Sequence, residues 1–600
     1  MIFPKPKYEA YFEEKYTLVN TKKADDAYSF YSQVKDGNED ITCFENKMLK
    51  KEEYGITIGK KGIIITYGTD EGLFRAITSL YQLVKKQGES LAFCEISDCP
   101  DIERRGLMIN ISSGRVYKLE MLKKIVDSMT ELKYNELQLY MDAFCFPYED
   151  YMEYVKEHSY ITAEEVKELD AYCTERFIDL VPNQNCFGHM QAWLAKKELA
   201  HLGVGNEEYP PTTINPLMPE TYEFIGKLFD SLLPCFSSKF VHVGMDEAKG
   251  LGRFQLKEYC DKYGRDTLYM EHLQKLWELA YKKHDKNIMF WADMVWDWEH
   301  MYHKIPKNAI AVEWGYQEVQ VQLMYEHCRR LKEGGVKFYV ASAVNAHASF
   351  TGTSDTNYFH IKTCGEIGKE LGATGILLTD WGSKGGFIWS YIPLALNAQY
   401  GWNVGPKQNG EDYKCDLLHA SWDFVDDYWF GGKKISKLLH RASSYYLLEA
   451  ERIHNASICG RLARKPLSMS CCPSSLNNEE HQFAPYADMN YIWDEFYDNN
   501  VITYMNAVMQ QFKDANLPQE QLNPILTTCK IVIFETMLNP IRVSQSVSAE
   551  KLKEIEALID EIKADYVSLW NNELKEKGME IYFAYLENRR NELRALCTHK

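Results

Sequence analysis

The 600-residue sequence lacks several features that mark specialised classes of protein. It contains no run of about 18 apolar residues, so no membrane-spanning helix is predicted. Its first residues do not form the apolar stretch of about 7 to 15 residues that is typical of a secretory signal peptide. A Lys/Arg stripe is also missing, and the formal charge is −18. This charge argues against a nucleic-acid partner, because phosphate binding needs a basic surface.

The sixteen cysteines are scattered, and none forms the paired Cys-x-x-Cys spacing of a zinc site or a redox centre. We therefore expect reduced, partly buried thiols in a cytoplasmic protein, with no metal and no cofactor. Apolar residues make up 45% and charged residues 26% of the chain, as in an ordinary globular protein. A chain of 600 residues exceeds what one hydrophobic core usually serves, so two or three domains are expected.

Three stretches of different character follow one another. Residues 1–100 contain a hairpin pattern at Ile56–Ile65 and an amphipathic pattern at Asp70–Lys85, which predict a small N-terminal α+β domain. Residues 101–410 alternate short apolar strands with amphipathic helices. Residues 411–600 have mainly helical patterns, such as Leu438–His454 and Ala549–Lys575. They predict a C-terminal helical domain whose apolar stripes serve packing or a homodimer contact.

The middle stretch contains eight candidate strands: Leu107–Ile111, Glu136–Tyr140, Ile178–Pro182, Phe240–Gly244, Ile288–Trp291, Ala309–Trp314, Lys337–Ala341 and Gly375–Leu378. Helices fit between most of them, at Leu119–Leu132, Ala163–Arg176, Leu268–Lys283, Val319–Glu333 and Ile361–Leu371. Thr162 and Glu165 form a capping box for the second of these helices. Eight strands with crossover helices predict an α/β fold, the (β/α)₈ TIM barrel. A doubly wound open sheet is the alternative.

Two adjacent carboxylates follow the fourth of these strands. The β-branched and aromatic run that begins at Lys239 stops at Gly244 and leads to Asp246 and Glu247. In a TIM barrel the chemistry gathers where the strands end, so this pair is a candidate for catalysis. The alternative is a solvated acidic loop, since most of the 86 Asp and Glu residues must lie at the surface.

Aromatic and hydrogen-bonding residues collect at the same end of the predicted barrel. They follow the second, third, fifth, sixth and eighth strands: Asp142, His189, Trp291, Asp293, Trp314, Tyr316, Asp380 and Trp381. A rim of this composition suits a sugar, because the C–H faces of a sugar stack on aromatic rings while its hydroxyls need donors and acceptors.

Taken together, these motifs resemble glycoside hydrolase family 20, the β-N-acetylhexosaminidases. Arg105-Gly106 resembles the opening motif of the family, Phe187-Gly188-His189 its Gly-His loop, and the segment His242–Glu247 its His-x-Gly-x-Asp-Glu signature. The order and spacing also match, and the likeness runs from about Tyr54 to Trp402. The methionine of the signature and the helical tail resemble a bacterial cytoplasmic branch of N-acetyl-β-glucosaminidases.

The resemblance implies an exo-acting, retaining β-N-acetylhexosaminidase that removes terminal β-linked GlcNAc or GalNAc from an oligosaccharide or glycan. The 2-acetamido group of the sugar, and no enzyme carboxylate, would attack the anomeric carbon. Glu247 would be the general acid and later the general base. Asp246 would hold the acetamido N–H and stabilise the oxazolinium ion. Consecutive residues tend to point in different directions, which suits this division of roles.

The same resemblance implies substrate contacts from the rim. Arg105 would hydrogen-bond sugar hydroxyls 3 and 4 through its planar fork. His189 would lie beside the catalytic centre, oriented by Asp142. Four aromatic residues would surround the acetamido group and the sugar ring, the last of them as a donor to the acetamido carbonyl: Trp291, Trp314, Trp381 and Tyr316.

Four positions depart from the family pattern. Asn110 and Ser113 stand where Asp and Arg are expected, and His347 stands at a tryptophan position. Ser383 stands where an acidic residue commonly binds sugar hydroxyls, and Asp380 is the candidate replacement for that acid. These departures leave the choice between gluco and galacto configuration open.

Two other classes of protein remain alternatives. One is an inactive, carbohydrate-binding relative, and the intact pair Asp246 and Glu247 counts against it. The other is a metal-dependent barrel hydrolase that uses His189, His242 and Asp293. Its ligands should converge at one end of the barrel, but His242 lies inside a strand and lacks a paired histidine motif.

Overall fold

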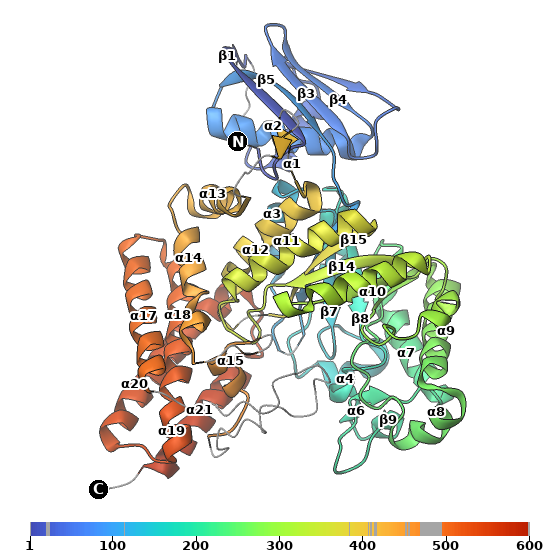
Figure 1. Cartoon of the computed structure of the whole chain (residues 1–600), viewed down its shortest axis with the longest axis vertical. Helices are drawn as coiled ribbons and strands as arrows, with labels where there is room; N and C mark the ends of the chain where they lie inside the picture. The colour runs from blue at the N-terminus through green and yellow to red at the C-terminus, as the bar shows by residue number, and fades with distance from the viewer. Residues whose placement is uncertain are drawn as a thin grey trace.

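The computed structural model describes residues 2–19, 24–112, 114–382, 384–405, 407–408, 411–412, 417–450, 453, 456–467 and 495–597. Figure 1 shows an N-terminal sheet with two helices, a barrel in the centre and a group of C-terminal helices beside the barrel. The α/β fold class is confirmed, with a barrel between an N-terminal α+β unit and a C-terminal helical unit. In the described part of the chain, no helix is long and apolar enough to cross a membrane.

The N-terminal unit is a five-stranded sheet with the strand order β1-β5-β3-β4-β2. Its strands are β1 (Tyr8–Thr17), β2 (Ile41–Glu45), β3 (Tyr54–Gly59), β4 (Gly62–Tyr67) and β5 (Ser90–Asp98). The predicted hairpin is the antiparallel pair β3 and β4. Alternate residues of this pair are buried, as the period of a strand requires, and they pack against α1 (Ala27–Lys35) and α2 (Asp70–Gln87).

Eight parallel strands close into the barrel in the order β11-β12-β13-β14-β15-β6-β7-β8. They are β6 (Arg104–Asn110), β7 (Glu136–Met141), β8 (Asp179–Gln184), β11 (Phe240–His242), β12 (Asn287–Trp291), β13 (Ile310–Trp314), β14 (Lys337–Ala343) and β15 (Gly375–Asp380). All eight predicted strands are therefore confirmed, with small shifts at their ends. The open-sheet alternative is wrong, because β8 pairs with β11 and β15 pairs with β6.

Helices cover the outside of the barrel (Figure 1). The main ones are α3 (Leu119–Glu131), α5 (Ala163–Thr174), α7 (Pro219–Leu232), α8 (Lys257–Tyr263), α9 (Arg265–His284), α10 (Val321–Glu333), α11 (Ser354–Leu371) and α12 (Tyr391–Trp402). The predicted capping box of α5 is present. The Thr162 hydroxyl accepts the N–H of Glu165, and the Glu165 carboxylate accepts the N–H of Thr162.

The C-terminal unit contains α13 (Leu417–Phe430), α14 (Ser436–Ala442), α15 (Ile458–Leu462), α17 (Glu495–Asp514), α18 (Gln519–Met537), α19 (Asn539–Ser544), α20 (Ala549–Glu573) and α21 (Met579–Leu596). The long helix predicted at Ala549–Lys575 is α20, with Ile555, Ile559 and Ile562 fully buried. The helix predicted at Leu438–His454 is too long: α14 ends at Ala442, and His454 lies outside the described residues.

A buried carboxylate joins the N-terminal unit to the barrel. Glu52 accepts from Arg105 Nη2 at 2.5 Å and from Arg75 Nε at 2.9 Å. Burial alone would raise the pKa of Glu52, but the two guanidinium groups outweigh it and lower this pKa. The domain boundaries at residues 100 and 410 stay predictions; the N-terminal sheet ends at Asp98 and the barrel begins at Arg104.

Candidate active site

The segment that connects β11 to the acid pair has a strained backbone. Gly244, Met245 and Glu247 have φ angles of 71°, 81° and 43°, in the left-handed region that side chains disfavour. A Cβ atom on Gly244 would lie 2.5 Å from Oδ1 of Asn185, so any larger residue at this position would clash with Asn185. Backbone strain of this kind is concentrated at functional sites.

The loop after β8 packs directly on the acid pair. A Cβ atom on Gly188 would lie 2.2 Å from the backbone oxygen of Asp246, so this approach also requires glycine. The next residue, His189, places its Nε2 3.2 Å from Oδ2 of Asp246 and 3.5 Å from Oε2 of Glu247. The fold therefore brings His189 beside an acid pair that lies far from it in the sequence.

His189 carries a positive charge between the two carboxylates. Burial alone would lower the pKa of His189, but the charges and hydrogen bonds of Asp246 and Glu247 outweigh it and raise this pKa to about 11. The two acids differ in exposure. The side chain of Asp246 is 11% exposed and that of Glu247 is 31% exposed. Glu247 is thus the more accessible of the two acids.

Several buried polar atoms around the acids have no hydrogen-bond partner among the described residues. They include Oδ1 of Asp246, Oδ1 of Asn185 and Nε1 of Trp291. Buried polar atoms without a partner are rare in folded proteins, and their presence at one place is typical of a site that binds water or a ligand. Oδ1 of Asp246 in particular is an acceptor for an N–H group of a ligand.

Asp293 is a third carboxylate at this site. Its Oδ2 accepts the backbone N–H of Glu247 at 3.0 Å, and its Oδ1 accepts the indole N–H of Trp314 at 3.4 Å. Burial, followed by the charge of Asp246, raises the pKa of Asp293. Asp293 therefore holds the backbone of the acid. The sequence placed Asp293 in the rim and among the ligands of the metal alternative, but gave it no role in holding the acid.

Aromatic residues at the ends of β12, β13 and β15 pack against one another at the same end of the barrel. The ring centroids of Trp291 and Trp381 lie 6.0 Å apart, and those of Trp314 and Tyr316 lie 5.0 Å apart. The indole N–H of Trp381 donates to the Tyr316 hydroxyl at 3.0 Å, which links the two pairs. Asn110, one of the departures from the family pattern, donates to the backbone oxygen of Trp381 at 3.3 Å.

The prediction for Arg105 is wrong. This residue is fully buried near the start of β6, at the opposite end of the barrel from the acid pair. Its guanidinium group binds the carboxylate of Glu52 and donates to the backbone oxygens of Ile102, Glu103 and Lys133. Arg105 therefore joins the barrel to the N-terminal unit and does not reach the substrate side.

The prediction for Asp380 also needs correction. Asp380 is 3% exposed, and its two carboxylate oxygens accept from the N–H of Gly382 and from the hydroxyl of Ser390. Both partners belong to the segment that follows β15, so this carboxylate holds its own loop and is not directed at sugar hydroxyls. Ser113 and Ser383, the other two departures in these loops, lie outside the described residues.

Asp142 follows β7, where its backbone oxygen accepts the indole N–H of Trp193 at 2.9 Å. That Asp142 orients His189 stays a prediction. His347 lies after β14, and burial lowers its pKa to about 3. Its backbone oxygen accepts from Arg464 at 3.1 Å, so this segment contacts the C-terminal unit.

The residues of the metal alternative do not converge. His242 is buried against the ring of Trp291, with ring centroids 4.5 Å apart, and burial lowers its pKa to about 3. Its Nδ1 accepts the N–H of Gly244. Over the ranges that the structure describes, no group of three or more His, Cys, Asp and Glu side chains is arranged to hold a metal ion.

Arg115 is a cation at this end of the barrel to which the sequence assigned no role. It lies in the loop after β6, and a Cβ atom on Gly382 would lie 3.8 Å from its Nε. Nε and Nη2 are buried and have no hydrogen-bond partner in the described part of the chain. These unpaired donors of a rigid fork make Arg115 a better candidate than Arg105 for contact with ligand hydroxyls.

A strained acid pair, a charged histidine and an aromatic rim at the C-terminal end of a TIM barrel define a carbohydrate-type site. Residues 103–345 match the model of Glycosyl hydrolase family 20, catalytic domain, and residues 6–99 match that of Glycosyl hydrolase family 20, domain 2. The two matches together cover more than half of the chain. The chain belongs to glycoside hydrolase family 20.

Similar proteins share limited identity with this chain. A beta-hexosaminidase of Vibrio furnissii is 23% identical over 321 residues, which are 46% of this chain and 51% of that protein. Beta-hexosaminidase A of Caenorhabditis briggsae is 25% identical over 270 residues, which are 40% of this chain and 49% of that protein. The chain thus spans about half the length of these curated relatives.

Solved structures share the fold. The chitobiase of Flavobacterium johnsoniae is 18% identical, with a TM-score of 0.58, over 95% of this chain and 98% of that chain. The exo beta-N-acetylglucosaminidase of Vibrio harveyi, in complex with N-acetylglucosamine, is 17% identical, with a TM-score of 0.55, over 72% of this chain and 77% of that chain.

Proposed function

We propose that this protein is an exo-acting β-N-acetylhexosaminidase that hydrolyses terminal β-linked GlcNAc or GalNAc by a retaining, substrate-assisted mechanism. One observation carries the proposal: two consecutive carboxylates share His189 but differ in exposure, with Asp246 enclosed and Glu247 accessible. This difference suits two distinct roles, whereas two carboxylates that flank a bond from opposite sides are less easily supplied by neighbouring residues.

Asp246 serves the nucleophile of the substrate. Its Oδ1 is buried and unpartnered, so it can accept the acetamido N–H and orient the acetamido oxygen toward the anomeric carbon. A well-held neighbouring group supplies about 7 to 11 kcal/mol through effective molarity. The anionic carboxylate then stabilises the positive charge of the oxazolinium ion.

Glu247 serves the glycosidic oxygen. It protonates the leaving oxygen in the first step and removes a proton from water in the second, which contributes roughly 10² to 10⁴ in rate. The backbone of Glu247 is held by Asp293 through a 3.0 Å hydrogen bond. Trp291, Trp314 and Trp381 enclose the sugar ring and exclude water from the reacting atoms.

The substrate class supported by these residues is an oligosaccharide or glycan that ends in an N-acetylhexosamine. A cytoplasmic location belongs to the same proposal, supported by the thirteen cysteines of the described ranges, which are free thiols. A homodimer through the C-terminal helices stays a prediction. An inactive relative and a metal-dependent hydrolase are the two alternatives that an activity assay distinguishes.

The test compares 4-nitrophenyl β-GlcNAc, β-GalNAc and β-glucoside, with a parallel series in EDTA. We expect turnover of the acetamido sugars at least about 10³-fold faster than turnover of the glucoside, because only the former carry the neighbouring group. Equal turnover of the glucoside would exclude substrate assistance. Loss of activity in EDTA would support the metal-dependent hydrolase, and binding of GlcNAc without turnover would support the inactive relative.

A further inference from the structure

Two loops at the active-site end of the barrel are attached to the C-terminal unit. The first follows β6 and comprises the described residues 111–112 and 114–118; the second follows β15 and comprises the described residues 381–382 and 384–390. Each carries a residue of the candidate site, Arg115 in the first loop and Trp381 in the second. We call them the first and the second loop.

Glu573, the last residue of α20, contacts both loops. Its carboxylate accepts the N–H of Phe387 in the second loop, at 3.0 Å from Oε2 and 3.3 Å from Oε1. Its backbone oxygen accepts the N–H of Lys118, at the end of the first loop, at 3.0 Å. A single residue of the C-terminal unit thus fixes both loops.

Residues next to Glu573 strengthen the attachment of the first loop. Leu574 forms an antiparallel bridge with Tyr117, and the N–H of Lys575 donates to the oxygen of Val116 at 2.8 Å. The second loop is shaped for the contact as well. Gly386 has a φ angle of 88°, and a Cβ atom there would lie 2.7 Å from Oε1 of Glu573.

One face of α20 meets the first loop. Tyr566, Trp570 and Glu573 are spaced by four and three residues, so they lie on the same side of the helix. The Tyr566 hydroxyl accepts from Nη1 of Arg115 at 3.3 Å, and the Arg115 guanidinium lies 5.9 Å from the ring centroid of Trp570. The position of Arg115 therefore depends on α20.

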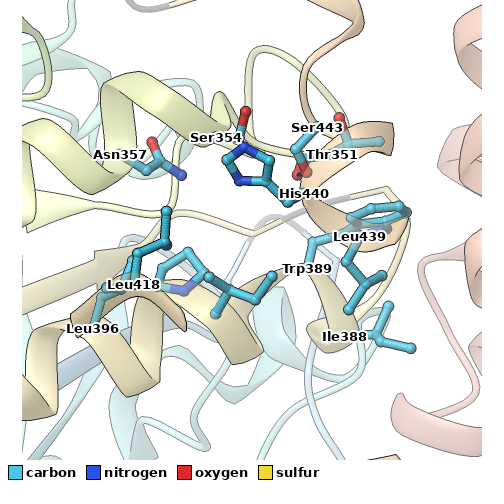
Figure 2. A pocket seen from close by; sticks show the side chains of 12 residues that line it. Thr351, Ser354, Asn357, Ile388, Trp389, Leu396, Leu418, Leu439, His440 and Ser443 are labelled. Carbon is cyan, nitrogen blue, oxygen red and sulfur yellow. Dashed lines mark hydrogen bonds between the residues drawn. The ribbon is translucent and has the colours of Figure 1, made fainter. Parts of the chain in front are cut away.

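The second loop has further attachments. The indole N–H of Trp389 donates to the hydroxyl of Thr528, on α18, at 2.9 Å. Ile388 and Trp389 also line a cavity of about 20 Å³ together with Leu439 of α14 (Figure 2). This volume holds about one water molecule, so the cavity is too small for a ligand and the loop is closely packed.

We propose that Glu573 is a positioning residue of the active site: by fixing both loops, it sets the distance between Arg115 and Trp381 and so the affinity for the terminal sugar. The inference rests on the proposed function. Glu573 contacts the loops that carry Arg115 and Trp381, so it acts through these loops and affects substrate binding more than the chemical step.

The chemistry around Glu573 indicates which variants separate positioning from charge. Burial raises the pKa of Glu573 to about 7, against the opposing effects of Arg115 and of the Phe387 N–H. A glutamine at this position keeps the shape and one acceptor oxygen of the side chain, whereas alanine removes both; the backbone oxygen that binds the first loop stays in either variant. Rescue by glutamine therefore reports on the hydrogen bond to the second loop.

The experiment measures KM and kcat for 4-nitrophenyl β-GlcNAc, the Kd for free GlcNAc by tryptophan fluorescence, and the thermal midpoint of unfolding. We expect Glu573→Ala to raise KM and Kd roughly 10- to 100-fold, because a displaced Arg115 would lose a charge-assisted hydrogen bond to the sugar, which is worth about that factor in binding. The value of kcat should change by less than about threefold, as for loss of an interaction that the bound substrate and the transition state share. Glu573→Gln should restore most of the affinity.

Two further variants make the test decisive. Ile559→Ala is the matched control: Ile559 is fully buried in α20, about 21 Å along the helix axis from Glu573, and its loss should lower the unfolding midpoint without changing Kd. Thr528→Val removes the acceptor of Trp389 and should raise Kd in the same direction as Glu573→Ala. It keeps the inference testable if the alanine variant does not fold.

The inference is overturned if Kd follows the unfolding midpoint in all variants, including Ile559→Ala. It is also overturned if Glu573→Ala or Thr528→Val lowers kcat and leaves Kd unchanged. Failure of the proposed function is a separate outcome: the wild-type protein would then turn over no N-acetylhexosaminide. The Kd comparison for GlcNAc would still decide whether Glu573 positions a sugar site.

Discussion

The imidazole of His189 lies 3.2 Å from the carboxylate of Asp246, whose side chain is only 11% exposed. A carboxylate with so little access to water would be costly without a positive partner. The charge of His189 offsets this cost, and the second oxygen of Asp246 stays open to a ligand. His189 thus keeps Asp246 ionised, so that its free oxygen can accept the acetamido N–H in the proposed mechanism.

Glu247→Gln should lower kcat by about 10² to 10⁴ on substrates with poor leaving groups, because the amide N–H is far too weak an acid to protonate the leaving oxygen. Binding of GlcNAc should stay close to that of the wild type. Steady-state kinetics with a GlcNAc disaccharide and fluorescence titration measure the two effects. Glu258→Gln, at an exposed position on α8, is the control. Full activity of the Glu247 variant would show that the acid is another residue.

Asp246→Asn should reduce kcat for 4-nitrophenyl β-GlcNAc by about 10² to 10³, as expected when one electrostatic stabiliser of a charged intermediate is removed. Turnover of the β-glucoside, which has no acetamido group, should hardly change. The ratio of the two rates is the measurement. A parallel fall in both rates would mean that Asp246 supports the structure and not the acetamido group.

The pKa of His189 predicts a pH-dependent contribution to stability. Its folded-state value of about 11 lies above the ordinary value of 6.5. The stabilisation is therefore fully present below about pH 6.5 and is lost as the pH rises toward 11. The difference in unfolding midpoint between the wild type and His189→Gln should shrink from pH 6 to pH 10. A difference that stays constant would mean that the histidine is not charged in the folded protein.

Arg105→Met should destabilise the protein by about 3 to 5 kcal/mol, because it leaves the buried Glu52 without one of its partners. KM for the GlcNAc substrate should stay unchanged, since Arg105 lies at the opposite end of the barrel from the acid pair. Chemical denaturation and steady-state kinetics give the two values. A large rise in KM without loss of stability would restore the role in sugar binding that the sequence suggested.

Arg115→Met should show the reverse pattern. Two buried N–H donors are lost from the active-site end of the barrel, so KM should rise roughly 10-fold, as for a hydrogen bond from a charged group worth about 1.5 to 3 kcal/mol. Arg115→Lys should recover little, because an ammonium group does not reproduce the planar fork. An unchanged KM in both variants would remove Arg115 from the site.

The parts of the fold that depend on local pattern could be predicted from the sequence. Each barrel strand is a short apolar run, and Asp246 and Glu247 follow one of them directly. Contacts between distant segments could not be predicted. Arg105 belongs to a motif that identifies a strand, but only the fold shows that this residue lies at the start of the strand and meets Glu52.

The predicted helix at Leu438–His454 failed for a similar reason. The pattern continues past Ala442, but the side chains of Ser443 and Ser444 hydrogen-bond to Thr351 and Ser354, which belong to the barrel. Serine side chains compete with helical hydrogen bonds when such partners are near. The partners are some 90 residues away along the chain, so no local pattern reveals them.

Glu52 lies between a guanidinium group of its own unit, Arg75, and one of the barrel, Arg105. Both Glu52 and Arg105 are buried, so their contact exists only while the two units stay packed against each other. The N-terminal sheet and the barrel should therefore melt in one transition. Thermal unfolding that begins in the sheet would then also unfold the catalytic barrel. Destabilising mutations in the sheet, far from the acid pair, would therefore lower activity by reducing the fraction of folded protein.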